Sequence, residues 1–212
     1  MTPIYLDYNA TTPVAPGVLD AMLPFLRAEF GNPSSSHPLG RRARDAVETA
    51  RAEVAALIGA SPAEIIFTSG GTEASNLAIR GAARRGTEKL PIVTSTIEHP
   101  ATEEVCRFMA RRGYPIRRIG ARPDGRVDVE EAGEAIRAGA GLVTLIHAQN
   151  EIGTLQPVAG IASVAHEHGA LVHADAAQSV GKVRVVVKAM GDWPQRGTLL
   201  VHLQARAVER RL

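Results

Sequence analysis

The stretch His173-Ala174-Asp175-Ala176-Ala177-Gln178-Ser179-Val180-Gly181-Lys182 follows an apolar run that begins at Ala170. The run is typical of a buried strand, and it is followed by a carboxylate, Asp175, and by an amide three residues later, Gln178. Parallel α/β sheets usually carry their ligands at the carboxyl ends of their strands. The stretch therefore predicts a parallel sheet with Asp175 and Gln178 in a ligand site at its edge.

The rest of the chain alternates between strand-like and helix-like runs. This alternation indicates parallel strands joined by right-handed crossovers. We expect a three-layer α/β fold with a mostly parallel sheet and with a loop rich in proline and serine over residues 31–38. The expected strands cover residues 64–68, 92–95, 116–119, 142–147 and 171–174. The expected helices cover residues 16–30, 40–58, 72–84, 101–112, 129–138 and 158–168.

Composition excludes several classes of protein. The 212 residues include 24 basic and 22 acidic side chains, and no basic run is interleaved with aromatic residues, so we expect no nucleic-acid partner. We also expect no membrane partner and a cytoplasmic protein, because no apolar run approaches the roughly 18 residues of a membrane span and the first residues do not resemble a leader. A single cysteine, Cys106, excludes an internal disulfide framework and is expected to be buried in a helix.

Asp175 indicates a particular cofactor. A carboxylate held against a pyridine nitrogen keeps the ring protonated, and a protonated ring is the better electron acceptor. This is the requirement of pyridoxal phosphate. The segment Thr68-Ser69-Gly70-Gly71-Thr72-Glu73 adds a candidate phosphate site, because two glycines precede a helix whose first amides and Thr72 hydroxyl can bind an anion. Such a turn alone is more often a plain connection, but its combination with Asp175 favours the phosphate.

Two further polar residues follow predicted strands. His99 could stack on a planar cofactor and relay protons, or it could only cap the helix that begins near Pro100. Asn150 could donate a hydrogen bond to a cofactor oxygen, or it could only form a turn. We assign no metal ligands.

Taken together, these segments resemble the cysteine desulfurase family of class V aminotransferases, which are pyridoxal-phosphate enzymes. The resemblance runs from about residue 4 to residue 190 and favours the housekeeping or nitrogen-fixation type. It implies the large cofactor-binding domain of fold type I. The similar segments are Tyr-Leu-Asp-Tyr-Asn-Ala-Thr-Thr-Pro at 5–13, Phe-Gly-Asn-Pro-Ser-Ser at 30–35, Phe-Thr-Ser-Gly-Gly-Thr-Glu at 67–73, Asn-Glu-Ile-Gly at 150–153, and 173–182.

The resemblance implies a role for each candidate residue. Gly71 and Thr72 would bind the cofactor phosphate, and Asp175 would pair with the ring nitrogen. His99 would stack on the ring and act as the catalytic residue that assists proton transfer. The remaining two would bind the ring oxygen or the substrate, and they are Asn150 and Gln178.

The resemblance also implies an activity and partners. The parent reaction removes sulfur from L-cysteine, leaving alanine and an enzyme persulfide that supplies iron–sulfur cluster assembly or other sulfur transfer. The implied partners are L-cysteine, a sulfur-acceptor or iron–sulfur scaffold protein, and a second copy in a homodimer. Two alternatives stay open: another class V aminotransferase or lyase, and a truncated, non-catalytic partner of an intact desulfurase.

The sequence departs from the family after about Met190. The family has there a lysine that attaches to the cofactor, and later a cysteine that accepts sulfur, whereas this chain reads Gly-Asp-Trp-Pro-Gln-Arg-Gly-Thr at 191–198. We therefore expect a cofactor-binding unit over 1–190, a divergent tail over 191–212 that forms a short amphipathic helix, no small C-terminal domain, and no complete turnover. A shifted reading frame would explain the abrupt change. The remaining lysines are expected on the surface, and they are Lys89, Lys182 and Lys188.

Overall fold

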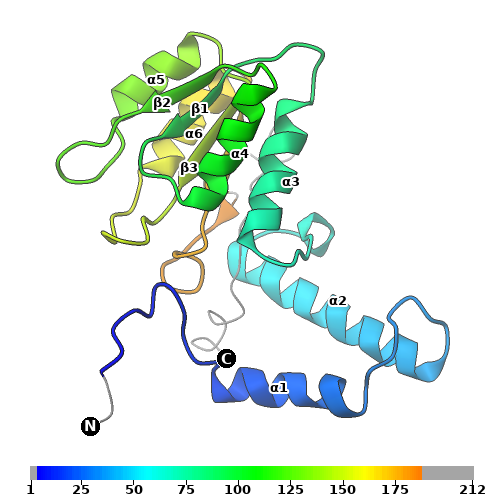
Figure 1. Ribbon diagram of the computed structural model, residues 1–212. Helices are drawn as coiled ribbons and strands as arrows, with labels where there is room; N and C mark the ends of the chain where they lie inside the picture. The colour runs from blue at the N-terminus through cyan, green and yellow to red at the C-terminus, as the bar shows by residue number, and fades with distance from the viewer. Residues whose placement is uncertain (1–3, 188–212) are drawn as a thin grey trace.

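A four-stranded parallel sheet forms the centre of the protein. The computed structural model describes residues 4–187 and is shown in Figure 1. The strands lie in the order β2-β1-β3-β4, with all neighbouring strands parallel. This arrangement confirms the predicted α/β class. The strands are β1 (Ile92–Ser95), β2 (Ile116–Ile119), β3 (Leu142–Ile146) and β4 (Leu171–Asp175).

Helices cover both faces of this sheet and make the predicted three layers (Figure 1). Helices α3 (Gly71–Ala83) and α4 (Pro100–Arg111) pack on one face, while α5 (Val129–Arg137) and α6 (Val158–Glu167) pack on the other. Because side chains alternate along a strand, each face has its own apolar core. The first residues of three strands belong to the core beneath α3 and α4, and they are Ile92, Leu142 and Leu171. The second residue of each of these strands belongs to the core beneath α5 and α6, and these are Val93, Val143 and Val172.

Two helices near the N-terminus extend away from the sheet (Figure 1). Helix α1 (Pro16–Arg27) ends three residues before the predicted boundary at residue 30, and none of its residues is buried. Helix α2 (Pro38–Ile58) ends at Gly59, whose positive φ of 70° suits glycine. The loop 31–38 folds tightly onto α2, because a Cβ on Gly40 would lie 2.5 Å from the Ser35 carbonyl oxygen.

The predicted strand over residues 64–68 is wrong. A short 3-10 helix, η1 (Pro62–Glu64), occupies its beginning, and the Ser61 amide donates a hydrogen bond to Glu64 Oε2 at 2.7 Å. The residues that follow are extended, but within residues 4–187 they pair with no strand. Ile66 and Phe67 remain 67% and 49% exposed. An apolar, β-prone run becomes a strand only when a neighbouring strand binds its backbone, and here no described strand does so.

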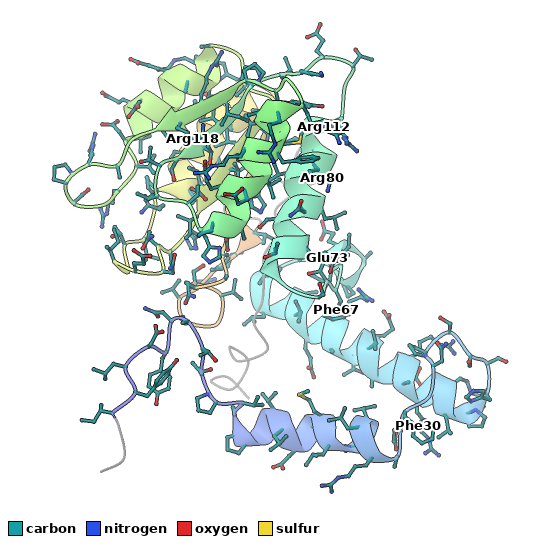
Figure 2. The ribbon with its side chains drawn as sticks, viewed as in Figure 1. Phe30, Phe67, Glu73, Arg80, Arg112 and Arg118 are labelled. Atoms are coloured by element: carbon teal, nitrogen blue, oxygen red, sulfur yellow. The ribbon has the colours of Figure 1, made fainter. Side chains whose placement is uncertain are left out.

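This extended segment is bound by helix α2 and not by the sheet. The Arg51 guanidinium donates a hydrogen bond to the Ile65 carbonyl oxygen at 2.6 Å and lies 4.9 Å from the centre of the Phe67 ring. Figure 2 shows Phe67 next to α2. The segment thus leads from α2 directly into the turn that begins α3.

Some expectations fall partly or wholly outside the described residues. Lys188 and the predicted tail over 191–212 belong to this group, so its amphipathic helix stays a prediction. Among residues 4–187, every helix is too short or too polar to cross a lipid bilayer.

The exposure of α1 leads to a prediction about local stability. A helix of 12 residues is marginal in water unless one face packs against other elements. We expect the α1 amides to exchange with solvent early in native-state hydrogen exchange, whereas the amides of the buried strand β3 exchange last. Mass spectrometry of peptides from the dilute protein measures both. Equal protection of α1 and β3 would contradict the prediction.

Candidate functional site

The order of the strands reverses between β1 and β3, and the region at the carboxyl ends of these two strands is called the crevice below. From β1 the chain moves outward to β2 and then returns past β1 to β3. The ladder between β1 and β3 consists of two residue pairs at the start of the strands, whereas β3 and β4 pair over five. The carboxyl ends of β1 and β3 therefore separate, and ligands of open α/β sheets bind at such a point.

The beginning of α3 lies at this end of the molecule (Figure 1). The first amides of a helix have no acceptor within the helix, and within residues 4–187 those of Gly71 and Thr72 have no other acceptor, so they can bind an anion. Thr72 is exposed, and a Cβ placed on Gly70 would meet no atom within 4 Å, so the approach to the turn is open. This geometry fits a phosphate group.

A carboxylate stabilises the same turn from within. Glu73 accepts hydrogen bonds from the Ser69 hydroxyl and the Ser69 amide, both at 2.6 Å, and these bonds lower the pKa of Glu73. Figure 2 shows Glu73 at the start of α3. Glu73 thus binds Ser69 and, within the described residues, does not occupy the Gly71 and Thr72 amides.

Asp175 is the last residue of strand β4, one residue beyond the predicted end of the strand at residue 174. Its residue is 9% exposed, and its Oδ1 accepts a hydrogen bond from the Ala177 amide at 3.1 Å. Its backbone oxygen accepts a hydrogen bond from the His147 amide at 2.8 Å, which fixes β4 to the end of β3. Within residues 4–187 no side chain pairs with Oδ2. A held, largely buried carboxylate with one unpaired oxygen fits a protonated ring nitrogen.

His99 caps helix α4. Its Nδ1 accepts a hydrogen bond from the Ala101 amide at 3.1 Å, so the neutral ring carries its proton on Nε2. The capping interpretation from the sequence is therefore confirmed. The side chain is also exposed at the carboxyl end of β1, so stacking on a cofactor remains compatible with the cap and stays a prediction.

Asn150 and Gln178 are brought together by a residue that the sequence reasoning missed. Asn9 Nδ2 donates a hydrogen bond to the Asn150 carbonyl oxygen at 2.9 Å, and Gln178 Nε2 donates one to the Asn9 carbonyl oxygen at 3.1 Å. Lys182 Nζ donates to Gln178 Oε1 at 2.5 Å. The Gln178 amide therefore keeps one N–H for a ligand. Exposed Lys182 confirms its predicted surface position.

Glu98 is the second residue that the sequence reasoning missed. Its Oε1 accepts hydrogen bonds from the Ser95 hydroxyl at 2.5 Å and from the Ile146 amide at 3.0 Å. Its Oε2 is buried and has no hydrogen-bond partner among residues 4–187. Burial raises the pKa of Glu98 to about 8, and the nearby Asp175 carboxylate adds to this effect. Glu98 is therefore mostly uncharged near neutral pH.

A buried histidine lies below the site on strand β4. His173 Nδ1 is 2.7 Å from the Thr144 hydroxyl oxygen, and burial lowers the pKa of His173 to about 4. His147 Nδ1 is 2.8 Å from Ser179 Oγ and thereby joins β3 to the turn after β4. Both rings are neutral at physiological pH and hold the ends of β3 and β4 in place.

Cys106 and a hollow at the other end of the sheet are not part of this site. Cys106 is fully buried, as predicted, and burial raises the pKa of its thiol to about 12. The hollow, of about 550 Å³, is lined by residues at the amino ends of the strands, among them Ile92, Leu142 and Leu171. It is therefore at the opposite end of the sheet from Asp175.

Comparisons with known proteins agree with this geometry. The family model for aminotransferase class V matches residues 4–192. A cysteine desulfurase of Cereibacter sphaeroides is 50% identical over 190 residues, which are 89% of this chain and 49% of that protein. The cysteine desulfurase IscS of Dictyoglomus turgidum is 44% identical over 189 residues, which are 89% of this chain and 48% of that protein.

Solved structures show the same relationship. The structure of SspA in complex with cysteine has a TM-score of 0.84 and 41% identity, and the match covers 88% of this chain and 54% of that one. The apo cysteine desulfurase of Thermococcus onnurineus has a TM-score of 0.82 and 31% identity, over 88% of this chain and 47% of that one. The chain belongs to the class V aminotransferase family. It spans about half the length of the curated relatives that it matches.

The raised pKa of Glu98 leads to a prediction about stability and pH. The folded protein keeps a proton on Glu98 that the unfolded chain releases above its ordinary pKa of 4.5, so stability falls as the pH rises toward about 8. The lowered pKa of His173 has the opposite effect on stability, but only below pH 6.5, the ordinary pKa of histidine in the unfolded chain. Between pH 6.5 and 8 we expect the free energy of unfolding to fall by up to about 1.4 kcal/mol per pH unit.

Urea unfolding of the protein and of Glu98→Gln at several pH values measures this slope. The variant cannot titrate at this position, so its stability should stay nearly constant in the same window. The prediction fails if the two proteins show parallel slopes.

The burial of Cys106 leads to a prediction about thiol reactivity. The thiolate is the reactive form, so a buried thiol with a pKa near 12 should react slowly. At pH 8 we expect a disulfide reagent to label the native protein at least roughly 100-fold more slowly than the protein in urea. Rapid labelling without unfolding would contradict the placement of Cys106.

Proposed function

We propose that this chain binds pyridoxal phosphate in the crevice between β1 and β3 and forms the cofactor-binding part of a cysteine desulfurase. The observation that carries the proposal is Asp175, a largely buried carboxylate that is held at the end of β4 with one unpaired oxygen. Asp175 suits a basic ring nitrogen, and the open helix terminus at Gly71 and Thr72 suits a phosphate. Together they support a ligand that has both groups.

Each residue of the site has a distinct task in this proposal. The Gly71 and Thr72 amides and the Thr72 hydroxyl bind the phosphate, and Asp175 holds a proton on the ring nitrogen. His99, fixed by its hydrogen bond to the Ala101 amide, lies against the ring and presents Nε2–H for proton transfer. The Asn150 side chain and the free N–H of Gln178 are the donors for the ring oxygen or the substrate carboxylate.

When bound, pyridoxal phosphate supplies the electron sink that weakens bonds to the carbon atoms of an amino acid. L-Cysteine is the proposed substrate, and the relatives named cysteine desulfurase support this choice. Cys106 is unsuited to accept the sulfur, because its thiol is buried and remains protonated. Lys182 donates to Gln178 and is exposed, so it is not held as a site for covalent attachment of the cofactor. We therefore expect noncovalent, weak binding and no complete turnover by this chain alone.

The proposal extends to partners and location. We infer a homodimer, a sulfur-acceptor or iron–sulfur scaffold protein as the recipient of sulfur, and a cytoplasmic location. The dimer is supported by the apolar side chains that α1 leaves exposed, among them Met22, Phe25 and Leu26. Large apolar side chains that gather on one surface typically mark a contact with another protein.

A binding titration tests the cofactor. We expect the absorbance and fluorescence of pyridoxal phosphate to change on saturable binding, and we expect Asp175→Ala to weaken this binding roughly tenfold because the countercharge of the ring is lost. Asp45→Asn, on the exposed part of α2, removes one negative charge elsewhere and serves as the control. Borohydride reduction followed by peptide mapping should find no single labelled lysine.

The proposal is wrong if the protein does not bind the cofactor, or if Asp175→Ala and Asp45→Asn bind it equally well. Stoichiometric label on Lys182 would overturn the noncovalent mode. Formation of alanine from L-cysteine by this chain alone would show that the expected inactivity is wrong.

A further inference from the structure

The loop between β1 and α4 contains four residues, 96–99, and it carries both Glu98 and His99. The Ile97 amide donates a hydrogen bond to Ser95 Oγ at 3.3 Å, and the Ser95 hydroxyl donates to Glu98 Oε1 at 2.5 Å. The loop therefore folds back onto the last residue of its own strand. Its only side-chain hydrogen bond to another strand of the described sheet is the one from the Ile146 amide to Glu98 Oε1.

This bond lies where the sheet is open. Because β1 and β3 pair over only two residue pairs at their beginning, the Ile146 amide has no backbone acceptor on β1. A buried amide without an acceptor is costly, and Glu98 Oε1 removes that cost. The carboxyl group thus replaces the missing rung of the ladder and connects the two strands that flank the crevice.

We propose that Glu98 is the positioning residue for His99, because it fixes the loop 96–99 to β3 through its two hydrogen bonds. The role at the cofactor rests on the proposed function, but the effect on His99 does not. The adjacent His99 then lies between the Glu98 side chain, which is anchored to β3, and helix α4, whose Thr102 amide donates a hydrogen bond to the His99 carbonyl oxygen at 2.9 Å. The imidazole then keeps one place and one tautomer before any ligand arrives, which is the preorganisation that a binding site needs.

The charges around Glu98 support an uncharged carboxyl group in this role. Asp175 on β4 and Glu103 on α4 face it with negative charge, and the neighbouring Cys106 is protonated. A neutral acid accepts the two hydrogen bonds on Oε1 without adding a second negative charge beside Asp175. Glutamine has the same shape and the same accepting oxygen, so it should replace Glu98.

Imidazole ¹⁵N NMR of the whole 212-residue chain without cofactor gives the first measurement. We expect the His99 Nδ1 signal to show an acceptor in one tautomer in the parent and in Glu98→Gln, and to move toward the averaged tautomers of a free histidine in Glu98→Ala. His37 is an internal control, because its Nδ1 also accepts from a helix amide, Gly40, but it has no contact with Glu98. Its signal should stay unchanged in every variant.

Cofactor titration gives the second measurement. We expect Glu98→Ala to raise the Kd for pyridoxal phosphate roughly tenfold and Glu98→Gln to change it by less than about twofold, since tenfold corresponds to the loss of about one good contact. Glu103→Gln is the matched control, because it removes a negative charge near Glu98, on α4, without changing a partner of Ser95 or Ile146.

The outcomes separate the two proposals. An unchanged His99 signal in Glu98→Ala, or the same loss in Glu98→Gln as in Glu98→Ala, overturns the positioning role. If Glu98→Ala does not fold, Glu98→Asp decides, because it keeps the carboxyl group but is too short to reach both donors, and it should show the alanine phenotype. If the parent does not bind pyridoxal phosphate, the proposed function fails, while the His99 signal still decides the role of Glu98.

Discussion

The separation of β1 from β3 is the constraint on which the site depends. Strands that stay paired along their whole length satisfy each other's backbone and leave no room for a ligand. Here the ladder stops after two pairs, and the backbone groups beyond it need other partners. Glu98 supplies one such partner to β3, while on the other side of β3 the ladder with β4 continues to the His147 amide and the Asp175 carbonyl oxygen. The strand ends beside the crevice therefore keep their backbone hydrogen bonds.

This opening also explains why polar residues gather on one side of the sheet. Towards the amino ends, the face beneath α3 and α4 is apolar, with Ile92, Leu142 and Leu171 in one cluster. Two positions along β3 and β4, the same face carries Thr144 and His173, and the next pair brings Asp175 beside Ile146. The period of two along a strand places these side chains in line. The core thus changes from apolar to polar over one strand length, and this gradient points to the site.

Much of this arrangement could be predicted from the sequence because it follows from local patterns. The order of strands and helices around β1 to β4 follows from hydrophobic periodicity, and the position of Asp175 follows from the end of an apolar run. The segment 64–68 was predicted wrongly for a physical reason. Its apolar residues show β propensity, but pairing is a long-range property. Within residues 4–187 the neighbours of this segment are α2 and the apolar cluster after β4, where Ile65 packs with Ala176 and Val180, and neither is a strand edge that pairs with it.

Asn9 and Glu98 could not be predicted as site residues for a related reason. Asn9 lies far from Asn150 and Gln178 in sequence, and only the folded chain brings them together. Glu98 would be expected at the surface, since glutamate side chains are rarely buried without a partner. Nothing in Glu98-His99-Pro100 indicates that its carboxyl group turns inward to bind Ile146. That contact depends on where β3 ends relative to β1.

The exposure of α1 has a consequence for how the whole protein denatures. The denaturant dependence of unfolding and the heat capacity change both scale with the surface that unfolding exposes. None of residues 16–27 is buried, and α2 buries only four of its residues, Gly40, Ala43, Ala55 and Ile58. Unfolding this part therefore adds little newly wetted area. The isolated chain should unfold with the m-value and heat capacity change of a smaller protein, one close in size to the layered α/β unit.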